Sequence, residues 1–349
     1  MHNESMVMQA ESDAPVPPGE ASIPCPSKTA FMAGTVAVDL GATRTRVAIR
    51  DAKGRTTDPI EEPTPSGGAD GTLLTGFLAG MIRRLLESGK LSGIDSIGLS
   101  VAGPVDVRAG ILKNPPNMQF RDVPIRDTLS REFSVPVRVV NDCHAGILGE
   151  LSFGKAGGRQ NAVYITISTG IGCGVVANGR ILLGRHGNAA EIGHFHVDST
   201  YNLQCGCGHS GHWEGYSSGR FLPWFFQEWC HYHGKAHWGS CNAEDIFQSA
   251  QQGDDDVLRF VDELNRINAR GVSDVIVAYD PELIIFDGAV MRHNSDLLLE
   301  PMIDSVDRYL DLPEIVMTGL SGDAPLLGAS VIAGGLDTAY GSFTAMTDE

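Results

Sequence analysis

Apolar and polar positions along the chain alternate in an order that predicts short strands and amphipathic helices. Short apolar runs predict strands at 35–40, 46–50, 96–100 and 135–141. Between the second and third of these, residues 72–88 repeat apolar side chains every three or four positions, which is typical of a helix with one buried face. The first half of the chain is therefore predicted to be an α/β domain.

The second half of the chain repeats this order. It contains an apolar strand at 162–167, a glycine-rich turn at 168–174, a returning strand at 175–177, a helix at 254–278 and a strand at 283–286. The dipeptide Asn178-Gly179 is typical of a two-residue hairpin turn. Because a strand–turn–strand unit occurs once in each half, we expect two similar α/β domains that face each other across a cleft.

The ends of the chain differ from its centre. Residues 1–31 combine five prolines with serine, alanine and glutamate, so we expect a disordered tail there. The first domain is expected over 32–141 and the second over 142–324. A helix at 325–340 is expected to pack back on the first domain.

Charge and composition exclude several classes of function. The chain has 349 residues, with 43 acidic residues against 26 lysines and arginines and a net charge of -17, which disfavours nucleic acid as a partner. There is no apolar run of about 18 residues and no basic, apolar leader, so we expect a cytoplasmic protein without a membrane partner. Seven cysteines, an odd number, favour a metal or structural role in a reduced compartment over a disulfide framework.

Two turns carry the residue types that bind phosphate. Residues 39–43 (DLGAT) and 168–174 (STGIGCG) combine hydroxyls with glycines that let a phosphate approach the backbone, although either turn could simply reverse the chain. A dinucleotide fingerprint is excluded, because the glycines at 170, 172 and 174 lead into a strand and not into a helix. Asp39 could hold Mg²⁺ directly or through water, or it could form the turn.

Asn141 and Asp142 follow a predicted strand, at the end where ligands of α/β sheets usually bind. A carboxylate in this position can take the proton from a substrate hydroxyl as that hydroxyl attacks phosphorus. Either residue could instead cap the helix that follows. The sequence alone leaves both roles open.

A cluster of histidines and cysteines is the strongest metal signal. Four residues at suitable spacing could form a tetrahedral zinc site: His194, Cys205, Cys207 and His212. His196 and His209 are rival ligands, and the alternative is a set of buried free thiols and solvated histidines. Four protein ligands would make the zinc structural, without an open position for catalysis. Glu191 and Glu214 flank the cluster, where the metal would hold them rigidly enough to bind sugar hydroxyls.

The combined motifs resemble those of the ROK family (repressor, open reading frame, kinase), which contains sugar kinases and sugar-responsive repressors. The resemblance covers about residues 33–335 and rests on DLGATRTR, SVAGPVD with a following PPN, VVND, ISTGIGCG, EIGH, CGCGHSGHWE and LLGAS. It implies a two-domain actin-like ATPase fold of the ribonuclease H-like class. ATP and Mg²⁺ would bind between the domains, and a hexose would be phosphorylated.

The resemblance also implies roles for individual residues. Asp142 would be the general base. The residues that would contact the sugar are Asn117, Asn141, Asp142, Glu191, His194 and Glu214. Those that would surround the phosphates and Mg²⁺ are Asp39, Gly41, Thr43, Thr169 and Gly170. Gly288 falls in the adenosine loop.

Three positions depart from the family pattern. Ala42 and Asp287 stand where glycine is usual, and the second change leaves nucleotide affinity uncertain. His212 replaces the usual third cysteine of the zinc box, and an imidazole can also bind zinc.

These observations favour an ATP-dependent kinase that acts on the 6-hydroxyl of glucose or a related hexose. N-acetylglucosamine or N-acetylmannosamine could be the substrate instead, and polyphosphate could replace ATP. A sugar-binding regulator would need a DNA-binding domain of some 60 residues, and only about 31 unstructured residues are expected before the first domain. A degenerate sugar-binding protein would normally have lost the base at Asp142. A homo-oligomer, here taken as a dimer, is common among similar proteins.

Overall fold

The computed structural model describes residues 34–51, 54–66, 71–87, 93–115, 118–236 and 238–335. The predicted N-terminal tail and the predicted sugar ligand Asn117 lie outside the described residues.

The first sheet is mixed, with strand order β3-β2-β1-β4-β7. Its strands are β1 (Thr35–Leu40), β2 (Arg44–Arg50), β3 (Ile60–Pro63), β4 (Ser96–Val101) and β7 (Val137–Asn141). β1, β2 and β3 form an antiparallel meander, while β4 pairs in parallel with β1 and β7. The predicted first hairpin is therefore confirmed, with β2 starting two residues earlier than expected.

Two helices cover one face of this sheet. They are α1 (Thr72–Glu87) and α2 (Ile125–Phe133), and α2 was not predicted. Leu74, Leu78 and Ile82 of α1 are buried in one hydrophobic cluster with the valines of β1 and β2, whereas Leu73 on the same helix is exposed. A two-stranded ribbon of β5 (Val105–Asp106) and β6 (Ile111–Leu112) lies beyond β4 in the chain.

The second sheet repeats the order of the first as β10-β9-β8-β11-β12. Its strands are β8 (Ala162–Ile167), β9 (Ile171–Ala177), β10 (Arg180–Ile181), β11 (Leu283–Asp287) and β12 (Glu314–Met317). Again a hairpin, β8–β9, precedes strands that pair in parallel. The duplication predicted from the sequence is thus present in both strand order and strand direction.

The outer part of the second half is helical. It consists of η1 (Ile192–His194), α4 (Glu214–Ser217), α5 (Leu222–Tyr232), α6 (Ala243–Gln251), α7 (Asp255–Tyr279), α8 (Ala289–His293) and α9 (Ser295–Asp304). The apolar face of α7 packs with strand β8 and helix α5 in the largest hydrophobic cluster of the described residues. Asp254 caps α7 by accepting two backbone N–H groups, which is why the helix begins there.

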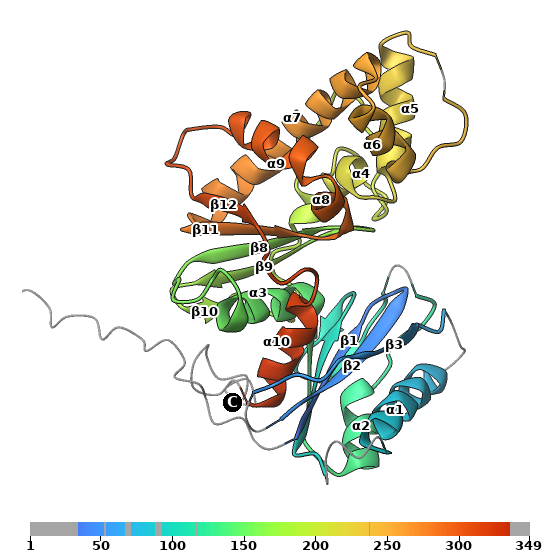
Figure 1. The fold of residues 1–349 in the computed structure, drawn as a ribbon, viewed down its shortest axis with the longest axis vertical. Coiled ribbons are helices and arrows are strands. Elements are labelled where there is room, and N and C mark those ends of the chain that lie inside the picture. The colour runs from blue at the N-terminus through green and yellow to red at the C-terminus, as the bar shows by residue number, and fades with distance from the viewer. Residues whose placement is uncertain are drawn as a thin grey trace, which may run out of the picture.

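Two helices, α3 (Asp142–Phe153) and α10 (Ala324–Ala333), lie side by side between the two sheets (Figure 1). α3 packs on β8 and β9, and α10 packs on β1 and β4. Their backbones meet directly at glycines: a Cβ atom on Gly328 would lie 1.8 Å from the carbonyl oxygen of Ala145, and one on Gly149 would lie 2.2 Å from that of Ala324. Only glycine permits so close an approach.

Two predicted boundaries were wrong. The glycine-rich turn was expected over 168–174, but β9 already begins at Ile171. Gly172 and Gly174 lie inside the strand because α3 packs on them: added Cβ atoms would come within 2.4 Å of the Cys143 sulfur and 2.1 Å of its carbonyl oxygen. The last helix was expected over 325–340 but ends at Ala333, where two glycines follow; residues 336–349 are outside the described part.

Candidate active site

Strand β7 places Asn141 and Asp142 at the carboxyl end of the first sheet, where α3 begins. Asn141 is the N-cap of α3, and its side-chain oxygen accepts the backbone N–H of Cys143 at 2.8 Å. The same N–H is 2.9 Å from Oδ1 of Asp142. The capping role therefore belongs to Asn141, and the Asp142 carboxylate shares its donor.

The surroundings of Asp142 favour its protonated form. Burial raises the pKa of this carboxyl to about 7, and the negative charges of Asp39 and Glu191 act in the same direction. The hydrogen bond from Cys143 opposes this shift. Asp39 belongs to the first half of the chain and Glu191 to the second, so the field at Asp142 comes from both. A base with a pKa close to 7 is suited to accept a proton at neutral pH.

Asp39, at the end of β1, is held by three hydrogen bonds. Its Oδ2 accepts from Nη2 and Nε of Arg46 at 2.7 and 3.1 Å, and its Oδ1 accepts from the hydroxyl of Ser100 at 3.0 Å. Arg46 is the last residue of the first phosphate motif, and the sequence predicted no role for it. Because both carboxylate oxygens already accept hydrogen bonds, Asp39 fits Mg²⁺ through a water better than it fits direct ligation.

The first phosphate-binding candidate is the turn between β1 and β2. A Cβ atom on Gly41 would lie 2.7 Å from the carbonyl oxygen of Arg44, so the turn requires glycine. The Thr64 hydroxyl donates to the backbone carbonyl of Gly41 at 2.8 Å, and the Thr64 N–H donates to the backbone carbonyl of Thr43 at 2.9 Å. The Thr43 side chain itself is exposed and available to a ligand.

The second candidate turn, 168–170, joins β8 to β9 and leaves Thr169 exposed. Glu214 braces this turn: its Oε2 accepts the N–H of Ile171 at 3.0 Å, and a Cβ atom on Gly170 would lie 2.6 Å from the same oxygen. Gly288, with φ of 93°, packs against the end of β8, since an added Cβ atom would lie 2.3 Å from the carbonyl oxygen of Ile167. The loop predicted to bind adenosine and the second candidate phosphate turn are thus neighbours.

The four predicted zinc ligands, together called the Cys/His box, lie close to one another. One ligand atom from each of four residues lies within 4.8 Å of the others: His194, Cys205, Cys207 and His212. The Nδ1 atoms face the sulfurs, at 3.7 Å for His194 and Cys205 and at 3.2 Å for His212 and Cys207. A tetrahedral zinc with bonds of 2.0–2.3 Å needs ligand atoms roughly 3.5 Å apart, so the four residues fit this metal. Burial and the neighbouring histidines lower the pKa of His212, which keeps it neutral as a ligand must be.

The rival histidines lie outside this group of four. His196 points to the hydroxyl of Ser199, at 3.0 Å from Nε2. His209 lies near His212, with ring centroids 5.9 Å apart and the ring planes inclined at 43°.

Glu191 and Glu214 lie beside the box, and the charge of Glu191 acts on Asp142. Partial burial of the Glu191 carboxyl raises its pKa; the positive charge of His194 opposes this shift, and the negative charge of Glu214 adds to it. Glu214 also lies 3.9 Å from the Cys205 sulfur through its Oε1. The box, the second phosphate turn and the acidic group around Asp142 are therefore linked through Glu214.

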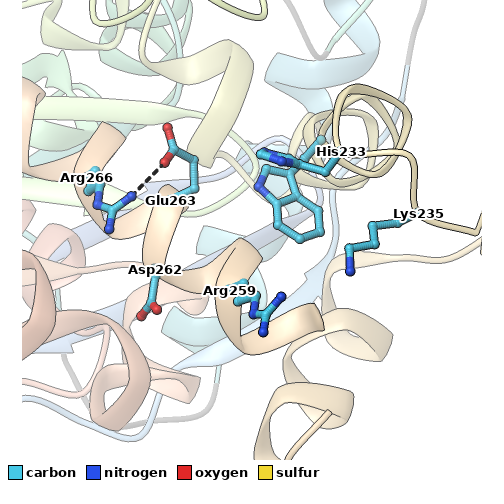
Figure 2. A pocket seen from close by; sticks show the side chains of 7 residues that line it. His233, Lys235, Arg259, Asp262, Glu263 and Arg266 are labelled. Carbon is cyan, nitrogen blue, oxygen red and sulfur yellow. Dashed lines mark hydrogen bonds and ion pairs between the residues drawn. The ribbon is translucent and has the colours of Figure 1, made fainter. Parts of the chain in front are cut away.

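The hollows on the surface of the described residues include the following two. Figure 2 shows the first, near the outer ends of α5 and α7, which is lined by Trp229, His233, Lys235, Arg259, Asp262, Glu263 and Arg266. Within this lining, Arg266 and Glu263 pair at 3.2 Å, whereas Lys235 and Arg259 pair with Asp256, which does not line the hollow. None of the predicted site residues lines it.

The second hollow measures about 400 Å³ and lies beside the loop of Gly288. It is lined by Arg292, His293, Ser295, Met317, Thr318 and Ser321. This volume falls within the range of small-ligand sites, and sequence reasoning assigned none of these residues to the site. A signal was available for Arg292 alone, as a cation four residues after Gly288.

Comparison with known proteins decides the family. The ROK family model matches residues 35–335. The chain belongs to the ROK family. A glucokinase of Aeropyrum pernix is 33% identical over 317 residues, which cover 86% of this chain and 97% of that protein.

Solved structures of ROK proteins share the fold. A ROK family glucokinase from Streptomyces griseus, in complex with glucose and AMPPNP, matches with a TM-score of 0.71 and 27% identity over 86% of this chain and 99% of its own. A ROK hexokinase from Thermus thermophilus matches with a TM-score of 0.72 and 30% identity over 86% and 97%. The predicted two-domain actin-like ATPase fold is confirmed. Among the described helices, none is long and apolar enough to span a bilayer.

Proposed function

We propose that this ROK protein is an ATP-dependent kinase that phosphorylates the 6-hydroxyl of glucose or a related hexose, with Asp142 as the general base. The observation that carries the proposal is the Asp142 carboxyl at the carboxyl end of β7, with a pKa raised to about 7. The glucokinases that the chain resembles support the kinase activity and the choice of glucose.

In this mechanism, the sugar O6–H donates its proton to Asp142 while the oxygen attacks the terminal phosphorus of ATP in line with the departing ADP. The O–P bond to the sugar forms, and the bond to the bridging oxygen of ADP breaks. Asn141, Glu191, His194 and Glu214 hold the sugar hydroxyls. Positioning and charge screening supply most of the rate acceleration in such reactions.

The donor would lie across the two glycine turns. The hollow beside Gly288 accommodates the adenosine, and the turns at 41–43 and 168–170 offer backbone N–H groups and the hydroxyls of Thr43 and Thr169 to the phosphates. Mg²⁺, when bound, screens the phosphate charge. Asp39, held in place by Arg46, would accept a hydrogen bond from a water bound to that ion.

Zinc would be held by two histidines and two cysteines, with no open position. It would fix the loop that carries His194 and Glu214. His194 would bind the metal through Nδ1 and turn its other ring nitrogen to the sugar. Zinc is therefore assigned a structural role that positions sugar ligands.

The arrangement of helices also supports a division of the chain. We place the two domains at 32–141 and 142–324, because α3 packs on the second sheet and α10 packs on the first. The described cysteines are free thiols, which is consistent with a reduced, cytoplasmic setting. A dimer stays a prediction, to be measured by light scattering.

A coupled assay tests the function directly. Purified protein with Mg·ATP should phosphorylate glucose faster than mannose, N-acetylglucosamine or N-acetylmannosamine. Replacing ATP with polyphosphate should give much lower rates. A higher kcat/KM on an N-acetylated sugar would transfer the assignment to that substrate, and negligible turnover on all four sugars would overturn the kinase.

The raised pKa of Asp142 predicts a pH-dependent effect on stability. The folded protein keeps a proton on Asp142 up to about pH 7, whereas an unfolded aspartate loses it near pH 4, so the free energy of unfolding falls as the pH rises between these values. Asp142→Asn removes this cost. Its melting temperature should exceed that of the wild type most at pH 8, and the excess should shrink toward pH 4.

Scanning fluorimetry between pH 4 and pH 8 measures this difference. Asp304→Asn is the matched control, because Asp304 is exposed on α9. Its melting temperature should differ from the wild type by a nearly constant amount. A constant offset for Asp142→Asn as well would mean that the pKa of Asp142 is not raised.

A further inference from the structure

Asp287, at the end of β11, is a buried carboxylate with three partners. Its Oδ2 accepts the hydroxyl of Tyr164 at 2.8 Å, and its Oδ1 accepts the backbone N–H of Gly288 at 2.7 Å. Oδ1 also lies 3.3 Å from Nε of Arg292, and only 3% of the Asp287 side chain is exposed. Tyr164 and Gly288 thus fix the carboxylate, and the carboxylate in turn fixes the guanidinium.

Arg292 extends from this carboxylate to the wall of the 400 Å³ hollow. About a third of its side chain is exposed (33%). Its Nη1 lies against Gly322, where an added Cβ atom would be 1.9 Å away. Nε forms the ion pair with Asp287, and the exposed third of the Arg292 side chain lies at the hollow, where a ligand can reach it.

A second guanidinium approaches Gly322. Nη2 of Arg46 donates to the Gly322 carbonyl at 2.8 Å, and the same nitrogen donates to Asp39 at 2.7 Å. Gly322 therefore lies next to both Arg292 and Arg46. Arg292 lines the hollow proposed for the donor, and Arg46 binds Asp39, which is proposed to lie near the phosphates. This places Arg292 at the side of the hollow that leads toward the phosphate-binding turns.

We propose that Arg292 binds phosphate oxygens of the nucleotide donor and that Asp287 is the residue that positions it. The inference rests on the proposed ATP-dependent function and adds a phosphate ligand to it. A guanidinium held at Nε by a carboxylate presents its remaining N–H donors in a fixed plane, which suits the oxygens of a phosphate. Asp287 also compensates the positive charge that would otherwise be left when the hollow is empty.

Nucleotide binding and kinetics test this role together. Arg292→Gln should raise the KM for ATP by about 10- to 100-fold, which is the loss typical of a charged hydrogen bond. The KM for glucose should stay within about twofold. By calorimetry, ADP should bind more weakly by a similar factor while adenosine keeps its affinity, because adenosine has no phosphate. For Arg292→Lys, the KM for ATP should lie between that of the wild type and that of Arg292→Gln.

Two further variants separate binding from folding. Arg292→Gln leaves the buried charge of Asp287 uncompensated, so Asp287→Asn/Arg292→Gln, which removes that charge, carries the same test if the single variant does not fold. Asp287→Asn alone should raise the KM for ATP by a smaller factor than Arg292→Gln does. Arg308→Gln is the matched control, because Arg308 is exposed and outside the hollow, and it should leave both KM values unchanged.

An unchanged affinity for ADP in a folded Arg292→Gln variant would overturn the inference. An equal loss of ADP and adenosine binding would overturn it too, since it would place Arg292 on the nucleoside or in the fold. The binding measurements need no turnover. A wild-type protein that binds ADP and phosphorylates no sugar would therefore refute the kinase and leave the role of Arg292 open to its own test.

Discussion

Replacing Asp142 with alanine should lower kcat for glucose phosphorylation by about 10³-fold while glucose still binds. General bases typically contribute about 10²- to 10⁴-fold to a rate, and Asp142 has both the position and the raised pKa of such a base. The sugar would keep its contacts with Asn141, Glu191, His194 and Glu214, so the loss falls on kcat and not on affinity. Coupled kinetics gives kcat, and calorimetry gives the dissociation constant for glucose.

Asp304→Asn serves as the control here as well, since it removes an exposed carboxylate from the same half of the chain and should leave kcat unchanged. A wild-type kcat in Asp142→Ala would remove Asp142 from the role of base. A loss of glucose binding equal to the loss of rate would instead make it a binding residue. Circular dichroism of each variant confirms that the comparison is made on folded protein.

Loss of the Cys/His site should be the second large effect. Cys207→Ser removes one of four ligand atoms that lie within 4.8 Å of one another, so zinc should fall from about one atom per chain to well below that. The melting temperature should drop by roughly 5–10 °C, because metal binding contributes to folding free energy. Activity should fall about 10- to 100-fold, since Glu214 braces the turn at Gly170 from this loop.

Cys241→Ser is the matched control, because that thiol lies outside the group of four and contacts Gln227 at 3.5 Å. Metal analysis of freshly purified protein, scanning fluorimetry and kinetics supply the three readouts. Chelation of the wild type should reproduce the Cys207→Ser phenotype. Full zinc content in Cys207→Ser, or none in the wild type, would contradict the ligand set.

The sequence predicts best those features that depend on local interactions. The hairpin of β1 and β2 follows from alternating apolar residues, and the spacing of Cys205, Cys207 and His212 lies within a single loop. The same holds for Asn141, whose capping bond reaches only two residues ahead. Such features depend on neighbours in the chain, so the residue types alone carry them.

Features that depend on distant segments were missed. Gly172 and Gly174 look like turn glycines in the sequence, and only the packing of Cys143 on β9 explains them as strand residues. Arg46 forms hydrogen bonds with Asp39, seven residues before it, and also with Gly322 and Asp323, which are distant in the sequence. No periodicity or spacing signals contacts of that kind.

The glycine contact between α3 and α10 has a consequence for catalytic geometry. Asp142 is the first residue of α3, and α10 packs on β1, the strand that carries Asp39. A single methyl group at position 149 or 328 should push the helix axes apart and move Asp142, the proposed base, away from the turn that follows β1. Displacements of about 1 Å can slow a reaction 100-fold. Gly149 and Gly328, although remote from the proposed reaction, would therefore set the distance between sugar and phosphate donor.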